Sequence, residues 1–173
     1  MPNVGAVRAR YEKAREDARR QAALNLQGQI GVDFYLSGWT RKALEAYLDQ
    51  WPSQRHPNAG WAWIEIFQRF RDIDRLDLVL WAGDRLAGLA IGTTTNVALR
   101  LDFIEGDFRE DCPLTGRRVL IFLEAAACYC QATGLTEIRV QPVNDAIEAL
   151  YCEVYGFELV TPVNETRYYR KKV

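Results

Sequence analysis

The chain has 173 residues, of which 49% are hydrophobic and 26% are charged, so it can bury the core of one globular domain spanning residues 1–173. Its 22 basic and 23 acidic side chains give a formal net charge of -1, which excludes a global basic field for binding nucleic acid or anionic membranes. No apolar run reaches the roughly 18 residues of a membrane span, and the charged N-terminus lacks the apolar segment of a signal peptide, so a cytoplasmic location is expected.

Histidine and cysteine are sparse and poorly spaced for metal binding. The single histidine, His56, lies in a loop-like sequence, where we interpret it as an ordinary surface residue. Cys128 and Cys130 lie two positions apart in a predicted helix, so their thiols point to different faces. We therefore expect no metal cofactor, no Ser-His-Asp triad and no cysteine nucleophile activated by histidine.

Residues 1–30 form an N-terminal extension that is predicted to be a charged helix over 6–26, which contains neither glycine nor proline. Its apolar stripe is thin, so the helix either packs loosely or offers a surface to a partner, with a homodimer as one alternative. The opposite charges at helical spacing are Glu12 with Arg15, and Glu16 with Arg19 and Arg20.

Two further helices are predicted, one beginning after Thr40 and one from near Asn58 to Arg71, with Thr40 and Asn58 as candidate N-caps. Tryptophan is concentrated around them. We expect most of these rings in the core and one or two in the wall of a pocket. The tryptophans of this region are Trp39, Trp51, Trp61 and Trp63.

Strand patterns begin at residue 76. The apolar runs 76–82 and 86–92 are separated by Gly83-Asp84, which predicts a β-hairpin, because glycine tolerates the positive φ of tight turns. A third strand is predicted over 97–103. Its alternation places four apolar side chains on one face: Val97, Leu99, Leu101 and Phe103.

The segment 117–133 is apolar on almost every side from Val119 to Ala132, which predicts a buried helix that ends at Gly134. A strand over 137–143 follows. Because a helix joins them, the strands 97–103 and 137–143 are expected to be parallel, through a right-handed crossover.

After this strand, Asn144 is a candidate N-cap of a helix that stops at Gly156. Its apolar side chains at helical spacing are predicted to face the sheet. They are Ile147, Leu150, Tyr151 and Val154. The chain closes with a predicted hairpin that turns at Asn164-Glu165.

The stretch NDAIEALYCEVYGF at 144–157 resembles the last motif of the GCN5-related N-acetyltransferases (GNAT superfamily). The matching residues are Asn144, Leu150, Tyr151, Gly156 and Phe157. The order of elements over 76–173 is also similar. The resemblance implies a mixed α/β (α+β) fold: a central mixed sheet of about six strands, a β-α-β core that binds acyl-CoA, and helices on both faces.

The resemblance implies an N-acyltransferase that moves an acetyl group from acetyl-CoA to an amine of a small molecule or peptide. Tyr151 would protonate the departing thiolate. The amine also needs a base, and the candidates at or just after the central strand are Asp102, Glu105 and Asp107. We choose Glu105, because the strand should open into the site there. The aromatic side chains suit an aromatic or peptide-like acceptor. The residues expected to contact acetyl-CoA are Phe103, Ile104, Leu114, Thr115, Gly116, Arg117, Arg118 and Asn144.

One motif departs from the family. Where relatives carry [RQ]-x-x-G-x-[GA] to bind pyrophosphate through backbone N–H groups, the segment 111–116 matches only at Gly116. Arg117 and Arg118 add positive charge there. This departure favours a second hypothesis, a GNAT-like binding or scaffold module without efficient catalysis. A third, a toxin-type enzyme that acetylates aminoacyl-tRNA, would need a basic groove from the first helix.

Overall fold

The computed structural model describes residue 1 and residues 3–51 and 60–173, in which one mixed sheet has seven strands in the order β1-β2-β3-β4-β5-β7-β6. The strand β1, which the sequence does not predict, makes the sheet larger than the expected six strands or so. The strands are β1 (Tyr35–Ser37), β2 (Leu76–Ala82), β3 (Arg85–Thr94), β4 (Ala98–Gly106), β5 (Glu137–Val140), β6 (Glu158–Val160) and β7 (Tyr168–Lys172).

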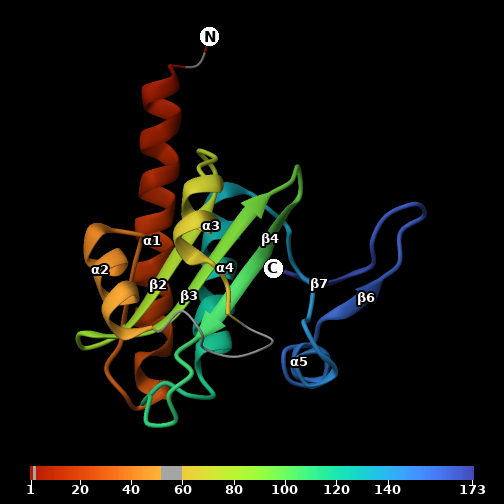
Figure 1. The fold of residues 1–173 in the computed structure, drawn as a ribbon. Coiled ribbons are helices and arrows are strands. Elements are labelled where there is room, and N and C mark those ends of the chain that lie inside the picture. The colour runs from red at the N-terminus through yellow and green to blue at the C-terminus, as the bar shows by residue number, and fades with distance from the viewer. Residues whose placement is uncertain (2, 52–59) are drawn as a thin grey trace.

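Helices cover both faces of the sheet, as the resemblance implies (Figure 1). On one face α1 and α4 share a core with the sheet, and on the other α2 and α3 pack against β2 and β3. The helices are α1 (Val4–Ile30), α2 (Arg41–Gln50), α3 (Trp63–Arg69), α4 (Arg118–Thr133) and α5 (Asp145–Ala149), and α5 continues as a π-helix (Leu150–Val154).

Several predicted signals are confirmed. Gly83 has φ 61° in the turn between β2 and β3, and Gly134 ends α4 in the left-handed region. Thr40 caps α2, and Asn144 caps α5 by accepting a hydrogen bond from the Ile147 N–H. β4 and β5 are parallel, joined through α4. The predicted cap Asn58 lies outside the described residues, as does His56.

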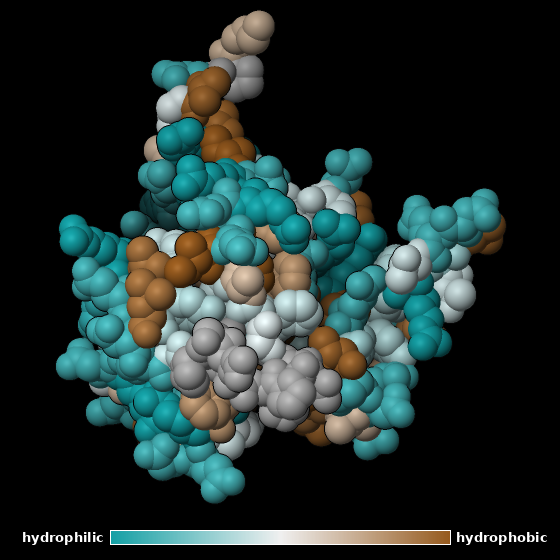
Figure 2. All heavy atoms as spheres, viewed as in Figure 1, coloured by the Kyte–Doolittle hydropathy of each residue, from teal (hydrophilic) through white to brown (hydrophobic). Residues whose placement is uncertain are grey.

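The helix α1 packs closely instead of loosely. Small side chains at Ala14, Ala18 and Ala22 are buried and bring its backbone near α4, whereas its N-terminal turns project beyond the rest of the molecule (Figure 1). Figure 2 shows apolar side chains on this projecting end, where Val4 is exposed. In the described part of the chain no helix is long and apolar enough to cross a membrane.

The expected ion pairs within α1 are not the ones that form. Arg15 and Arg19 turn inward to Asp77 on β2, where Arg19 Nη2 lies 2.8 Å and Arg15 Nε lies 3.8 Å from Oδ1. Asp77 Oδ2 also accepts a hydrogen bond from the Trp39 N–H at 2.7 Å. This buried carboxylate therefore joins α1, β2 and the segment that leads into α2.

The predicted face of β4 is wrong at Phe103. The register between β3 and β4 shifts by one residue, because Ile91 pairs with Phe103 and Gly92 pairs with Leu101, leaving Asp102 as a bulge. A bulge inverts the alternation of side chains beyond it. Leu101 therefore packs on the side of α1 and α4, whereas Phe103 packs on the side of α3.

The helix after Asn144 is also less regular than predicted. The Tyr155 N–H donates to the Leu150 carbonyl, five residues back, so the last turn is a π-helix. The wider turn rotates the last predicted core residue away from the sheet, and Val154 is 66% exposed. The final hairpin is confirmed between β6 and β7, but its connection is the longer segment 161–167, in which Asn164 has φ 62°.

Replacing Asp77 by alanine should lower the free energy of unfolding by about 3–5 kcal/mol, because Arg15 and Arg19 would keep buried charge without a counter-charge. Urea unfolding followed by circular dichroism measures this. The matched control is Asp84→Ala, whose carboxylate is fully exposed beside Lys42 and should cost less than about 0.5 kcal/mol. Similar losses in the two variants would contradict the anchoring role of Asp77.

Candidate active site

The parallel strands β4 and β5 separate part-way along their length. Their pairing runs from Ala98 with Glu137 to Leu101 with Val140 and ends there, although β4 continues to Gly106. Two features account for the separation. The bulge bends β4 directly after Leu101, and Pro142 follows β5 without an N–H that could extend the ladder.

Two cavities meet where the strands separate. An outer cavity of about 540 Å³ lies on the face of β4 and β5 away from α4. An inner cavity of about 210 Å³ reaches toward the start of α4 and the π-helix. The residues that line both are Leu101, Asp102, Val140 and Gln141. Ligands that enter from the two sides would therefore meet at these four residues, of which Asp102 alone carries an ionisable side chain.

Tyr151 lies in the wall of the inner cavity and is 4% exposed. Its ring packs against Phe157 with the ring centroids 5.2 Å apart. Burial raises the pKa of Tyr151, and the neighbouring Tyr155 raises it further. The hydroxyl is therefore protonated at neutral pH and can donate a proton into the cavity.

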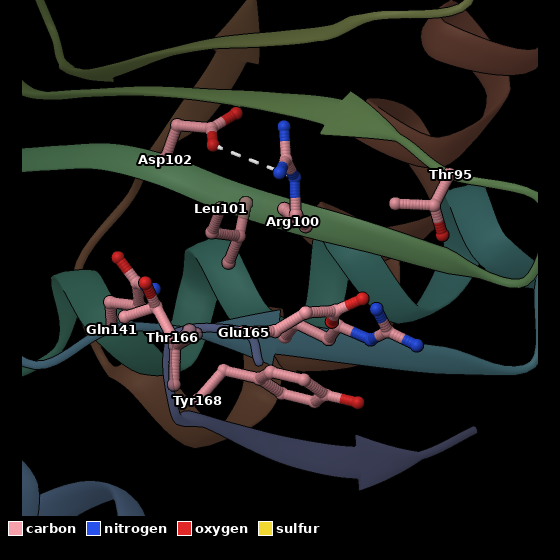
Figure 3. Close-up of a pocket in the computed structure, with 10 residues that line it drawn as sticks. Thr95, Arg100, Leu101, Asp102, Gln141, Glu165, Thr166 and Tyr168 are labelled. Carbon is pink, nitrogen blue, oxygen red and sulfur yellow. Dashed lines mark ion pairs between the residues drawn. The ribbon is translucent and has the colours of Figure 1, made fainter. Parts of the chain in front are cut away.

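Asp102 is the carboxylate at the meeting point of the cavities. Its Oδ2 accepts a hydrogen bond from Thr93 Oγ1 at 2.7 Å, and its Oδ1 lies 3.8 Å from Arg100 Nε (Figure 3). Burial raises the pKa of Asp102 above its ordinary value, although the Thr93 hydrogen bond opposes that shift. A raised pKa strengthens a carboxylate as a proton acceptor.

Glu105, the base expected from the sequence, lies further along β4 among the tryptophans. Its buried Oε1 accepts hydrogen bonds from the Trp61 N–H at 3.0 Å and from Trp63 Nε1 at 2.9 Å. It lines neither the inner nor the outer cavity. Its predicted role stays a prediction, while the geometry favours Asp102, another of the three candidates from the sequence.

The connection from β4 to α4 is fixed by a buried carboxylate. Asp107, whose side chain is fully buried, is held by Arg85 at 2.7 Å and Arg109 at 2.8 Å. Burial alone would raise the pKa of Asp107, but the hydrogen bonds from Arg109 and Arg85 outweigh it and leave the pKa lowered. Asp111 also pairs with Arg85. The connection is thus anchored at its beginning.

The end of this connection leaves backbone donors unpaired. Thr115 and Arg117 donate to Cys112 and Leu114, and Gly116 turns with φ 80°. Across the described residues no acceptor is found for four N–H groups at the start of α4, and these belong to Gly116, Arg118, Val119 and Leu120. They form a site of positive potential suited to an anion.

Comparisons with known proteins agree on the architecture. The structure is similar to that of an acetyltransferase of the GNAT family from Staphylococcus aureus (TM-score 0.59, 11% identity, 81% of this chain and 99% of that one). It is also similar to Ard1 from Thermoplasma volcanium (TM-score 0.57, 13% identity, 82% and 99%). A third similar structure is that of the ribosomal-protein-S18-alanine N-acetyltransferase from Escherichia coli (TM-score 0.53, 20% identity, 80% of this chain and 90% of that one).

The fold is that of the GCN5-related N-acetyltransferases. No protein-family model matches the sequence, and no curated protein matches it either. The GNAT fold is therefore established by structure at low sequence identity.

Within the GNAT fold, the residues expected to contact acetyl-CoA divide into two groups. Ile104 and Arg118 line the inner cavity. The others do not: Phe103 packs against Trp61 and Phe70 on the side of α3, Leu114 is buried in the core, Thr115 and Gly116 are exposed in the connection, and Asn144 caps α5.

The two arginines at the start of α4 point in different directions. Arg118 Nη1 donates to the Asp107 carbonyl at 2.7 Å, and its side chain crosses Gly106 in the inner cavity. Arg117 Nη1 instead lies near Gly31, beyond the C-terminal end of α1. Positive charge is favourable beside the negative end of that helix dipole. Arg118 is thus the arginine that faces the cavity.

The sequence predicts one or two tryptophans in the wall of a pocket, and Trp61 lines the inner cavity. Sequence reasoning passed over Gln141 and Arg139 as lining residues. Gln141-Pro142 was the available signal, because a proline directly after a buried parallel strand marks where its pairing ends. No local signal identifies Arg139, since its place depends on the register between β5 and β7.

Replacing Gly106 by alanine should cost about 1–2 kcal/mol of unfolding free energy, because a Cβ there would overlap Arg118 and break its bond to Asp107. In an Arg118→Ala background the same substitution should cost less than about 0.5 kcal/mol. Urea unfolding of the four chains of this double-mutant cycle gives both values. Strictly additive losses would show that Arg118 does not occupy the space above Gly106.

Proposed function

We propose that the protein is an N-acyltransferase that moves an acetyl group from acetyl-CoA to an amine. The observation that carries this proposal is the separation of β4 and β5, which opens cavities on both faces of the sheet that meet at Asp102. Two substrates that react with each other need such an arrangement, because each must reach the same point from its own side.

The inner cavity suits the donor. Its volume of about 210 Å³ is below the roughly 300–1,000 Å³ of pockets for bulky ligands, which favours a narrow pantetheine arm. The unpaired N–H groups of Gly116, Arg118, Val119 and Leu120 lie at the start of α4, where the pyrophosphate would bind. These donors support acetyl-CoA binding even though the segment 111–116 lacks the glycine pattern of the family.

The proposed chemistry uses one proton acceptor and one proton donor. Asp102 takes a proton from the ammonium, and the free amine nitrogen forms a bond to the thioester carbonyl carbon. The carbon–sulfur bond then breaks, and the thiolate takes the proton of the Tyr151 hydroxyl. The nitrogen then gives its second proton to the Tyr151 phenolate, which leaves a neutral amide, free CoA as the thiol and a neutral Tyr151. Asp102 releases the first proton to solvent, so one proton is released for each acetyl group transferred.

Isothermal titration with acetyl-CoA tests donor binding directly. We expect a dissociation constant in the micromolar range. It should rise by about tenfold or more in Arg118→Ala, because a charged hydrogen bond to the phosphates of acetyl-CoA is lost. Arg20→Ala, at an exposed site on α1, is the matched control and should bind unchanged. No binding by the wild-type chain would reject the proposal and favour the binding or scaffold module.

Two tyrosine-to-phenylalanine substitutions test whether the Tyr151 hydroxyl donates the proton. Tyr151→Phe should lower kcat by about 10²-fold, because the thiolate loses its proton donor. Tyr155→Phe removes the hydroxyl of a half-buried tyrosine four residues away that lines neither cavity, and its kcat should stay within about twofold of wild type. Equal losses from both would show a packing effect instead of proton donation.

Two isosteric substitutions decide between the candidate bases. Asp102→Asn should lower kcat by about 10²–10⁴-fold, whereas Glu105→Gln keeps an oxygen for Trp61 and Trp63 and should change it little. The base works deprotonated, so activity rises with pH through the pKa of Asp102, which burial raises. That rising limb should disappear from the pH–rate profile of Asp102→Asn. Its loss in Glu105→Gln instead would assign the base to Glu105.

A further inference from the structure

The outer cavity carries balanced charge, which is informative about the acceptor. Two arginines and two carboxylates face it, and they come from β4, from β5 and from the connection between β6 and β7. Figure 3 shows Glu165 and Thr166 of that connection on the side opposite Asp102 and Arg100 of β4. A polycation or a polyanion would leave half of these charges uncompensated.

Arg139 is held in a fixed orientation. Its Nε and Nη2 both lie 2.6 Å from Glu137 Oε1, and its guanidinium carbon lies 4.5 Å from the centroid of the Tyr168 ring. Within the described residues Nη1 has no acceptor, and the side chain is 21% exposed at the cavity. A guanidinium fixed on one edge presents the other edge to an anion at little entropic cost.

Arg100 adds a second, less constrained cation. Its Nη2 donates to Thr93 Oγ1 at 3.1 Å, and its side chain is 53% exposed. Thr93 Oγ1 in turn donates to Asp102, so the arginine and the candidate base belong to one hydrogen-bonded chain. The cavity thus has cations on both strands beside the carboxylate at which an amine would react.

We propose that the acceptor is a primary amine that also carries a carboxylate, with its amine at Asp102 and its carboxylate at Arg139 and Arg100. This inference rests on the proposed acetyl transfer. A single negative charge matches the cavity better than a phosphate dianion does, because Asp102 and Glu165 already offset part of the arginine charge. The carboxylate would orient the acceptor and would take no part in the bond-forming step.

Matched acceptors test the inference in the acetyl-transfer assay. Glycine, β-alanine, γ-aminobutyrate and ε-aminocaproate vary the distance from amine to carboxylate, and n-alkylamines of the same lengths lack the carboxylate. At least one amino acid should exceed its alkylamine in kcat/KM by about tenfold or more, as expected for a charge-assisted hydrogen bond. Equal values throughout, or preference for phosphoethanolamine, would overturn the inference while leaving acetyl transfer intact.

Arginine variants test whether Arg139 and Arg100 cause the preference for an acceptor with a carboxylate. The ratio of kcat/KM for the preferred amino acid over its alkylamine should fall by about tenfold in Arg139→Gln and by a smaller factor in Arg100→Gln. Arg167→Gln, an exposed position on the same connection as Glu165 that does not line the cavity, should keep the wild-type ratio. Because the two cavity variants lie on different strands, loss of folding in one leaves the other as a test. An unchanged ratio in the variants that fold would overturn the inference.

A binding measurement separates this inference from the proposed function. The N-acetyl derivatives of the same amino acids and alkylamines are titrated into the protein by calorimetry without acetyl-CoA. Binding that requires the carboxylate and weakens in Arg139→Gln supports the cavity assignment even if no acetyl transfer is found. No binding and no preference in turnover would reject the assignment, whatever the outcome of acetyl-CoA titration.

Discussion

The structure depends on the point at which β4 and β5 stop pairing. Only four residue pairs join these strands, from Ala98 with Glu137 to Leu101 with Val140. Beyond them the sheet has to part, because β4 bends at the Asp102 bulge and the chain after β5 runs into Pro142. Every residue proposed to act in transfer lies at or beside this point, so the interruption of the ladder is what creates the site.

The two separated strands would be poorly positioned without anchors on either side. Asp77 ties α1 to β2 through Arg15 and Arg19, and Asp107 ties the connection after β4 to β3 through Arg85. Buried ion pairs of this kind contribute little net stability, since desolvation offsets most of the attraction. Their effect is on geometry. The Asp107 pairs hold the beginning of the connection into α4, and the Asp77 pairs hold α1 against the sheet.

Most of the fold could be predicted from local patterns, because those patterns are set by neighbours in the sequence. Gly83 marks a turn, Gly134 a helix end and Asn144 a helix start whatever the rest of the chain does. The motif at 144–157 then supplied the architecture by resemblance. The prediction that failed depends on pairing across the sheet. Alternation along one strand cannot reveal the extra residue, Asp102, that β4 holds opposite β3, so Phe103 was placed on the wrong face.

The same limitation explains why the sequence could not identify which carboxylate of β4 lies at the junction of the cavities. Asp102 and Glu105 lie on one strand, and an uninterrupted alternation gives no reason to prefer the residue at the bulge. In the structure, Asp102 is distinguished because it lines both cavities, and Glu105 is distinguished by its hydrogen bonds from two tryptophans. The predicted ion pairs of Arg15 and Arg19 within α1 failed for a similar reason. Their partner Asp77 lies about sixty residues away in sequence and is brought near only by the packing of α1 on the sheet.

Burial raises the pKa of both proposed proton carriers. It raises the pKa of Tyr151, which keeps the hydroxyl protonated and ready to donate, and it raises the pKa of Asp102, which makes that carboxylate a better acceptor. Both residues line the inner cavity, where electrostatic interactions are stronger than in bulk water. A polar opening at this point would lower the pKa of Asp102 and weaken the base, so enclosure of the site is itself part of the proposed chemistry.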